Sequence, residues 1–234
     1  MSEDRSSDVR RKLLIVAIDG PSGAGKGTVA RAVADRLRYR HVDTGAMYRA
    51  VGWKALREGV DLTDECATAG VAERAQIRVL NQTVSVDGQD VTRDIRTPEI
   101  DAAATAVARQ PRVREILIAQ QRELGKGGGV VMEGRDIGTV VFPNADVKVY
   151  LDAAPDERAR RRANDPAHAS GRSGAAVQDV ASALEARDRS DRTRATSPLT
   201  RADDAIEIDT TELPVDEVID RVLTVVRAVQ SLSR

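Results

Sequence analysis

The sequence predicts an α/β fold in which a five-stranded parallel sheet is flanked by helices. Three observations support this prediction. Short apolar runs alternate with longer segments of helical periodicity. Hairpin turn signals are rare outside one segment near residue 88, so most strands should be joined by helical crossovers. Strands that alternate with helices are typical of a parallel sheet covered on both faces.

The individual elements follow from this alternation. Five runs are expected to form the sheet, at residues 13–18, 40–42, 130–132, 147–151 and 205–209. Helices are expected after residue 28, from near residue 46, over residues 98–124 with a bend or interruption at Pro111, and from Pro214 onward.

One segment breaks the α/β pattern. Two short β-type runs precede the turn signal Asp87-Gly88, which predicts a β-rich insertion over residues 61–98. We therefore expect a core formed by residues 12–60 and 99–234, with a short lid at about 155–174. Residues 1–11 are polar and are expected to form a disordered tail.

Composition narrows the class of protein. The 234 residues fit one α/β domain with small insertions, and the net charge of −1 gives no general attraction to nucleic acid or anionic membrane. One Trp, one Phe and three Tyr are too few for base stacking along a single strand. A lone Cys66 and the lack of a long apolar stretch favour a cytoplasmic protein, which we expect to be a monomer.

The most informative motif follows the first predicted strand and precedes a helical pattern. It comprises Gly20, Pro21, Ser22, Gly23, Ala24, Gly25, Lys26, Gly27 and Thr28. Glycines let the backbone fold closely around an oxyanion, so that N–H groups and the positive end of the helix point inward. Lys26 adds an ammonium group that can follow the charge of a transferred phosphate. The motif predicts a phosphate-binding loop for a nucleoside triphosphate; the alternative is a tight turn with an exposed lysine.

The loop departs from the common pattern at one position. Ser or Thr usually follows the lysine and reaches magnesium, but here Gly27 stands there and Thr28 comes next. Mg²⁺ is therefore expected to be held mainly by water and phosphate oxygens. No residue is assigned as a direct metal ligand, while Thr28 and Glu133 are candidates for contact through water.

Two further charged segments follow predicted strands. Thr44 and Arg49 come after the second strand and could converge on a phosphate or sugar, unless they only cap a helix and face solvent. Arg135 and Asp136 come after the third strand, where Arg135 could bind phosphate bidentately or pair internally with a carboxylate. Because ligands bind at the carboxyl ends of parallel strands, we expect these groups to share one site with the phosphate loop.

The chain carries two further arginine-rich segments. On a helix, Arg187, Asp191 and Arg194 would share one face, suited to a ribose hydroxyl and a phosphate or equally to a salt-bridged surface. Arg158, Arg161 and Arg162 would occupy adjacent turns of a mobile lid and neutralise charge during transfer, or else form a solvated basic helix. His41 and His168 have no partner spacing that suggests a role.

Together these motifs resemble the bacterial cytidylate kinase family of nucleoside monophosphate kinases. The resemblance covers residues 20–28, 43–49, 111–114, 134–136 and 187–194, and it extends to the 61–98 insertion as a monophosphate-binding domain. It implies a P-loop kinase fold and transfer of the ATP γ-phosphoryl group to CMP or dCMP. The products would be CDP or dCDP and ADP, formed in a closed, arginine-rich site with Mg²⁺.

The resemblance also implies roles for single residues. The loop residues 20–28 would bind the ATP phosphates. The acceptor's phosphate and sugar would be held by Thr44, Arg49, Arg135, Arg187 and Asp191, and its cytosine by Thr105, Arg114, Asp136 and Arg194. Groups acting directly in transfer would be Lys26, Arg135, Arg187 and Arg161. The sequence of the lid at 163–174 departs from the family pattern.

Two other functions are compatible with the phosphate loop. One is a P-loop kinase acting on another small molecule, such as adenylate, guanylate or shikimate. The other is a nucleotide-gated binding module, which the absence of an Asn-Lys-x-Asp guanine signature disfavours.

Overall fold

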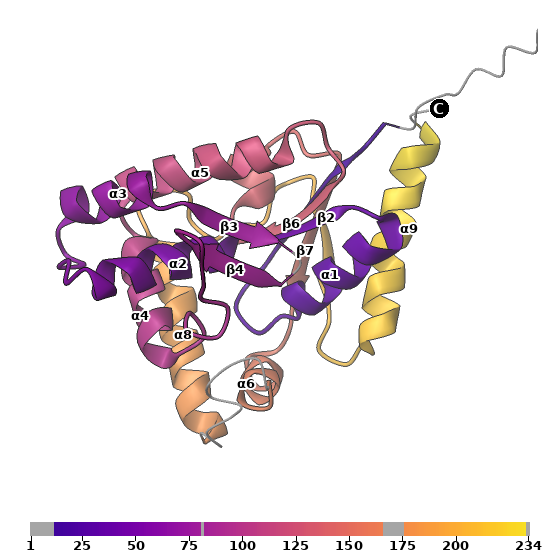
Figure 1. The fold of residues 1–234 in the computed structure, drawn as a ribbon. Helices are drawn as coiled ribbons and strands as arrows, with labels where there is room; N and C mark the ends of the chain where they lie inside the picture. Colours follow the sequence, from indigo (N-terminus) through magenta and orange to yellow (C-terminus); the bar gives the residue numbers. More distant parts are fainter. Residues whose placement is uncertain (1–11, 81, 166–175, 233–234) are drawn as a thin grey trace, which may run out of the picture.

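The computed structural model describes residues 12–80, 82–165 and 176–232. Within these ranges the chain forms a five-stranded sheet and a smaller three-stranded sheet, with helices packed around both (Figure 1). The predicted tail at 1–11, the lid residues 166–174 and His168 lie outside the described residues.

The larger sheet is parallel throughout, as predicted. Its strands are β1 (Ile15–Asp19), β2 (Arg40–Asp43), β6 (Val130–Gly134), β7 (Val147–Asp152) and β8 (Ile206–Asp209). Their order is β2-β6-β1-β7-β8. The register pairs Asp43 with Glu133 and Asp19 with Gly134, so these polar ends meet at one edge of the sheet.

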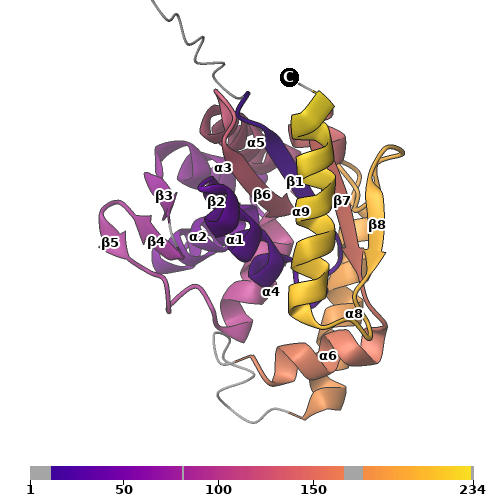
Figure 2. The same ribbon diagram turned by 90° about the vertical axis from the view of Figure 1, so that its right-hand side faces the viewer.

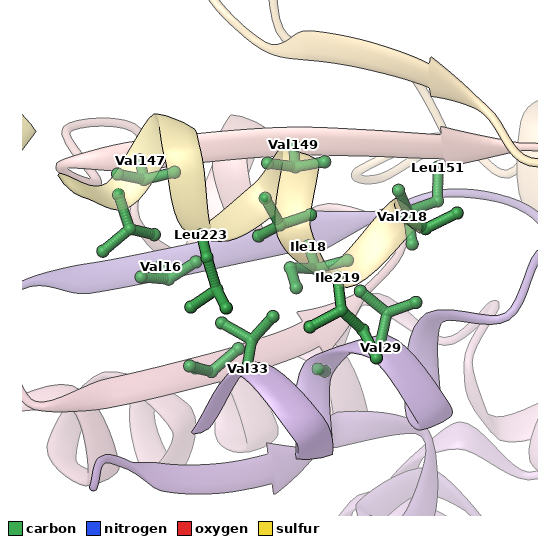
Figure 3. Packing of buried hydrophobic residues seen from close by; sticks show 14 of the residues in the cluster. Val16, Ile18, Val29, Val33, Val147, Val149, Leu151, Val218, Ile219 and Leu223 are labelled. Atoms are coloured by element: carbon green, nitrogen blue, oxygen red, sulfur yellow. The ribbon is translucent and has the colours of Figure 1, made fainter. Parts of the chain in front are cut away.

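Helices cover both faces of this sheet. The helices α1 (Lys26–Leu37) and α9 (Val215–Leu232) cover one face, and α2 (Thr44–Arg57) and α5 (Pro111–Gly125) pack on the other. Helix α4 (Pro98–Val107) packs on α2, and α6 (Pro155–Ala163) and α8 (Val177–Thr193) pack against each other. Helices α1 and α9 lie side by side in front of the sheet in Figure 2. Figure 3 shows apolar side chains from β1, β7, α1 and α9 meeting in one buried cluster. Because the chain has few aromatic residues, this cluster consists mainly of Val, Ile, Leu and Ala side chains.

Two helix boundaries have identifiable causes. The helix expected near residue 46 begins at Thr44, because the Asp43 carboxylate caps it by accepting a hydrogen bond from the N–H of Ala46 (3.0 Å). The helical segment over 98–124 is interrupted, as predicted: α4 ends at Val107 and α5 starts with Pro111 as its first residue.

The 61–98 segment contains both strand and helix. Strands β3 (Ile77–Leu80), β4 (Thr83–Val86) and β5 (Gln89–Asp90) form the antiparallel sheet. Helix α3 (Glu65–Arg74) precedes them, which the prediction of a β-rich insertion did not include. Buried side chains of β4 pack against α2, so the segment lies over the second helix of the core.

After β6 the chain makes a π-helical turn, η1 (Ile137–Val141). Such turns are rare and are frequent at functional sites. In the part of the chain that the structure describes, no helix is both long and apolar enough to cross a bilayer.

Candidate active site

A cleft of about 820 Å³ opens where β1, β2 and β6 end. It gathers most of the site residues predicted from sequence. From the phosphate loop and the lid helix the cleft is lined by Ser22, Gly23, Ala24, Gly25, Lys26, Gly27, Thr28 and Arg161. From elsewhere it is lined by Thr44, Arg49, Thr105, Arg114, Glu133, Arg135, Asp136, Arg187, Asp191 and Arg194. Gly20 and Pro21 belong to the same loop but do not line the cleft.

The phosphate loop needs glycine for steric reasons. Gly20 has φ +146°, and a Cβ there would lie 1.9 Å from the carbonyl oxygen of Leu151. Gly23 has φ +80°, and a Cβ there would lie 2.8 Å from the carbonyl oxygen of Arg158. Gly25 precedes α1 without a side-chain cap, so the first N–H groups of the helix are available to an anion.

Lys26 is the first residue of α1 and is buried beneath the loop. Its Nζ donates to the carbonyl oxygen of Pro21 at 2.6 Å. Burial, reinforced by the nearby Arg135 guanidinium, lowers the pKa of Lys26 to about 7. A phosphate bound in the loop would counter both effects and favour the charged ammonium.

Arg158 braces the loop from behind. Its guanidinium is buried, pairs with Asp188, and donates to the carbonyl oxygens of Ser22 (3.0 Å) and Ala153 (3.1 Å). Asp188 in turn accepts the Ser22 N–H (3.2 Å). From its spacing, Arg158 was predicted to be one of the lid arginines. Its contacts with Ser22, Ala153 and Asp188 show instead that it supports the loop.

Two further arginines of α6, Arg161 and Arg162, face different ways. Arg161 donates to the hydroxyl (2.9 Å) and the carbonyl oxygen (2.6 Å) of Thr210, and its Nη1 lies 3.8 Å from a Cβ built on Gly25. It therefore borders the phosphate loop. Arg162 donates to the Asp101 carboxylate at 2.6 Å, on the opposite side of the cleft.

Glu133, in β6, directs its carboxylate toward Gly27 at the start of α1. A Cβ on Gly27 would stand 3.2 Å from Glu133 Oε1, so a side chain at that position would be in tight contact with the carboxylate. The same oxygen lies 3.0 Å from His41 Nε2, and the Glu133 carbonyl accepts the Thr44 hydroxyl at 2.7 Å. His41, for which no role was predicted, thus contacts the Glu133 carboxylate beside the loop.

Asp19 organises the turn that follows β6. Its carboxylate accepts the N–H groups of Ile137 (2.8 Å) and Gly138 (2.7 Å). Burial raises the pKa of Asp19 to about 6, although the two backbone hydrogen bonds favour ionisation. The contacts tie the end of β1 to the segment that carries Arg135 and Asp136.

Arginine–carboxylate pairs form a second part of the cleft lining, separate from the loop. Arg114, only 1% exposed, pairs with Asp136 and stacks on Tyr48, with Cζ 5.4 Å from the ring centroid. Arg194 approaches Asp136 (3.7 Å) and Asp191 (3.6 Å). Among the described residues, Arg114 Nε and Arg194 Nη2 have no hydrogen-bond partner, so buried donors remain for a polar ligand.

Two further arginine–carboxylate pairs line the same cleft. Arg135 Nε donates to Asp191 at 3.0 Å, and Arg49 donates to Asp43 at 2.9 Å. Burial opposes ionisation of Asp43, but Arg49 and Arg96 hold its pKa down at about 2. Burial likewise opposes ionisation of Asp191, whose pKa is lowered by Arg135 and its neighbours. The carboxylates therefore stay charged and offset the repulsion between the arginines.

Comparison with known proteins agrees with this geometry. The family model described as cytidylate kinase matches residues 16–228. The chain belongs to the cytidylate kinase family. A cytidylate kinase of Solibacter usitatus is 47% identical over 222 residues, covering 95% of this chain and 96% of the relative. One of Limosilactobacillus reuteri is 45% identical over 223 residues, covering 94% and 97%.

Solved structures agree at the level of fold. A gluconokinase of Sinorhizobium meliloti superposes with a TM-score of 0.51 at 16% identity, covering 95% of this chain and 97% of that one. The core of this cytidylate kinase family member is thus a P-loop kinase fold.

Some residues that line or support the cleft could not be predicted from the sequence. Arg96 lines the cleft beside Arg49 and Asp43, yet it follows an insertion strand with no motif of its own. Asp19 and His41 are single polar residues whose partners lie 118 and 92 positions away. In the cytidylate kinase fold only the sheet register brings these partners together.

Proposed function

We propose that this protein transfers the γ-phosphoryl group of ATP to CMP or dCMP, forming CDP or dCDP and ADP. The observation that carries the proposal is the buried Arg114–Asp136–Arg194 cluster, which lines the same cleft as the phosphate loop. A nucleoside triphosphate would bind with its phosphates at the loop, and a nucleoside monophosphate would bind with its base at the cluster. The phosphate groups of the two nucleotides would then face each other. Membership of the cytidylate kinase family supports the same assignment.

The cluster is suited to a cytosine base. Cytosine presents an amine donor and ring acceptors, which a carboxylate and guanidinium groups can pair with. Asp136 would accept from the amine, while Arg114 and Arg194 would donate to the ring acceptors. The Thr105 hydroxyl, which donates to the Asp101 carbonyl at 2.8 Å, would contribute a further oxygen. Uracil has a carbonyl oxygen in place of the amine and would face the Asp136 carboxylate unfavourably.

The residues between cluster and loop would hold the rest of the acceptor. Arg49, Arg135 and Arg187 supply planar donor groups that suit phosphate oxygens, with Thr44 nearby. Asp191, held ionised by Arg135, would accept from a ribose hydroxyl. Arg96 would add a fourth guanidinium to the phosphate site.

At the other end, the loop residues 20–28 and the start of α1 would bind the donor's phosphates through backbone N–H groups. Within the described ranges no group of three or more His, Cys, Asp or Glu side chains is placed to hold a metal ion. Mg²⁺ keeps several waters and would bind mainly to the substrate phosphates. Thr28, and Glu133 beside Gly27, would hold it through water, and the ion would neutralise phosphate charge when bound.

Transfer then needs alignment and charge neutralisation more than acid–base chemistry. The acceptor's phosphate oxygen would attack the γ-phosphorus in line, and the ADP oxygen would leave. Lys26 and Arg161 would stabilise charge from the donor side, and Arg135 and Arg187 from the acceptor side. Closure of the lid helix would exclude water and so limit hydrolysis of ATP.

The test is a coupled assay of ADP formation with CMP, dCMP, UMP, AMP and GMP as acceptors, at fixed ATP and Mg²⁺. We expect turnover with CMP and dCMP that exceeds that with either purine nucleotide. A preference for AMP or GMP would contradict the assignment. ADP formation without dependence on any acceptor would favour a nucleotide-gated binding module instead.

A further inference from the structure

Asp101, in the first turn of α4, joins arginines from two other helices. Its Oδ2 accepts from Arg162 Nη2 of α6 at 2.6 Å, and its Oδ1 accepts from Arg187 Nη1 of α8 at 3.3 Å. Both guanidinium groups line the cleft, whereas Asp101 itself does not. The carboxylate therefore holds the two arginines from behind, and it links the lid helix to the acceptor side of the cleft.

These arginines need a counter-charge. Burial lowers the pKa of Arg187, and Arg135 and Arg49 add like-charge repulsion; burial, Arg187 and Arg49 act in the same way on Arg162. Asp101 opposes both effects. Without it, the two guanidinium groups would be driven apart and toward water.

The ion pairs with Asp101 also fix the direction in which the guanidinium groups of Arg162 and Arg187 point. A guanidinium carries five N–H donors, more than a single carboxylate oxygen can accept, so each arginine can hold Asp101 and contact an anion in the cleft. Two guanidinium groups side by side match the oxygens of one phosphate group.

We propose that Asp101 is a positioning residue that holds Arg162 and Arg187 together so that both bind the phosphate of the acceptor nucleotide. Among the α6 arginines, Arg162 then serves the acceptor, Arg161 serves the donor and Arg158 is structural. This proposal rests on the proposed function, since it assumes a monophosphate acceptor in this half of the cleft.

The first test is Asp101→Asn, which keeps the size of the side chain and removes its charge. A charged hydrogen bond lost on each arginine predicts roughly tenfold weaker binding of the acceptor, measured by calorimetry without ATP, and a similar rise in its KM. The KM for ATP should stay within about twofold of wild type. Glu99→Gln is the matched control, because Glu99 is an exposed acid in the same helical turn.

A double-mutant cycle with Arg162→Gln separates positioning from a structural role. If Asp101 acts through Arg162, adding Asp101→Asn to Arg162→Gln should weaken acceptor binding by less than about threefold. An equal loss in both backgrounds, together with a higher KM for ATP, would show that Asp101 only stabilises α4 and would overturn the proposal. Tighter acceptor binding in Asp101→Asn would overturn it too, since the carboxylate would then compete with phosphate.

The wild-type acceptor panel is measured first. If it shows preference for a monophosphate other than CMP or dCMP, the proposed function fails, and the Asp101 variants are tested with that nucleotide. Failure of the two proposals is thereby distinguished.

Discussion

The two ends of the cleft are built in different ways. At the phosphate-loop end (residues 20–28), the proposed anion site is made of backbone N–H groups from one continuous segment, fixed by glycines and by the start of α1. At the arginine end (Arg49, Arg114, Arg135, Arg187 and Arg194), it is made of side chains from α2, α5, α8 and the loops after β6 and α8, each paired with a carboxylate. A backbone site suits any polyphosphate, whereas a side-chain site can be specific for one nucleotide.

The largest expected effect is at the phosphate-loop end. Lys26→Ala should lower kcat by about 10³-fold or more, because it removes the one side-chain cation of the loop that can follow charge on the transferred group. The fold should survive, because the hydrogen bond of this side chain to the Pro21 carbonyl lies within the loop itself. Steady-state kinetics with a circular dichroism control would check this, and unchanged turnover would remove the loop from the mechanism.

The next expected effect distinguishes structural from functional arginines on α6. Arg158→Met should reduce the free energy of unfolding by about 3–5 kcal/mol, because it leaves the buried Asp188 carboxylate without its partner. Denaturant unfolding would measure this. Arg160→Met is the control: Arg160 is exposed and pairs with Glu157, so its removal should leave the stability nearly unchanged. Equal stability of both variants would mean that Arg158 does not brace the loop.

A smaller effect is expected in the number of protons taken up when a nucleotide binds. With a pKa of about 7, Lys26 is mostly neutral at pH 8 in the free protein, and a bound triphosphate should recharge it. Binding of a non-hydrolysable ATP analogue at pH 8 should therefore take up most of one proton, relative to Lys26→Met. Below pH 6 the difference should vanish, because Lys26 is already protonated. Calorimetry in buffers of different ionisation enthalpy would measure it; the same proton uptake in both proteins would contradict the shift.

The difference between the two ends of the cleft also explains which features could be predicted from the sequence. The phosphate-loop end was predictable because one motif, placed between a strand and a helix, specifies its backbone. The parallel sheet followed from the alternation of strands and helices. The separate roles of Arg158, Arg161 and Arg162 did not follow, because neighbouring residues on a helix point in different directions and their partners come from distant segments.

Other features of the site could not be predicted because the residues in contact are far apart in the sequence. Asp19 was not predicted to belong to the site, because its hydrogen bonds are made to the turn after β6, far along the chain. The His41–Glu133 contact depends on the pairing of β2 with β6. Helix α3 was missed in the insertion, where the hairpin signal dominated the pattern.

The most direct test of this division is the ratio of kcat/KM for CMP to that for UMP, in wild type and in Asp136→Asn. If the arginine end recognises cytosine, the wild type should prefer CMP, and the substitution should reduce the ratio at least about tenfold while the KM for ATP stays unchanged. An unchanged ratio, or a loss that falls on ATP instead, would contradict the account.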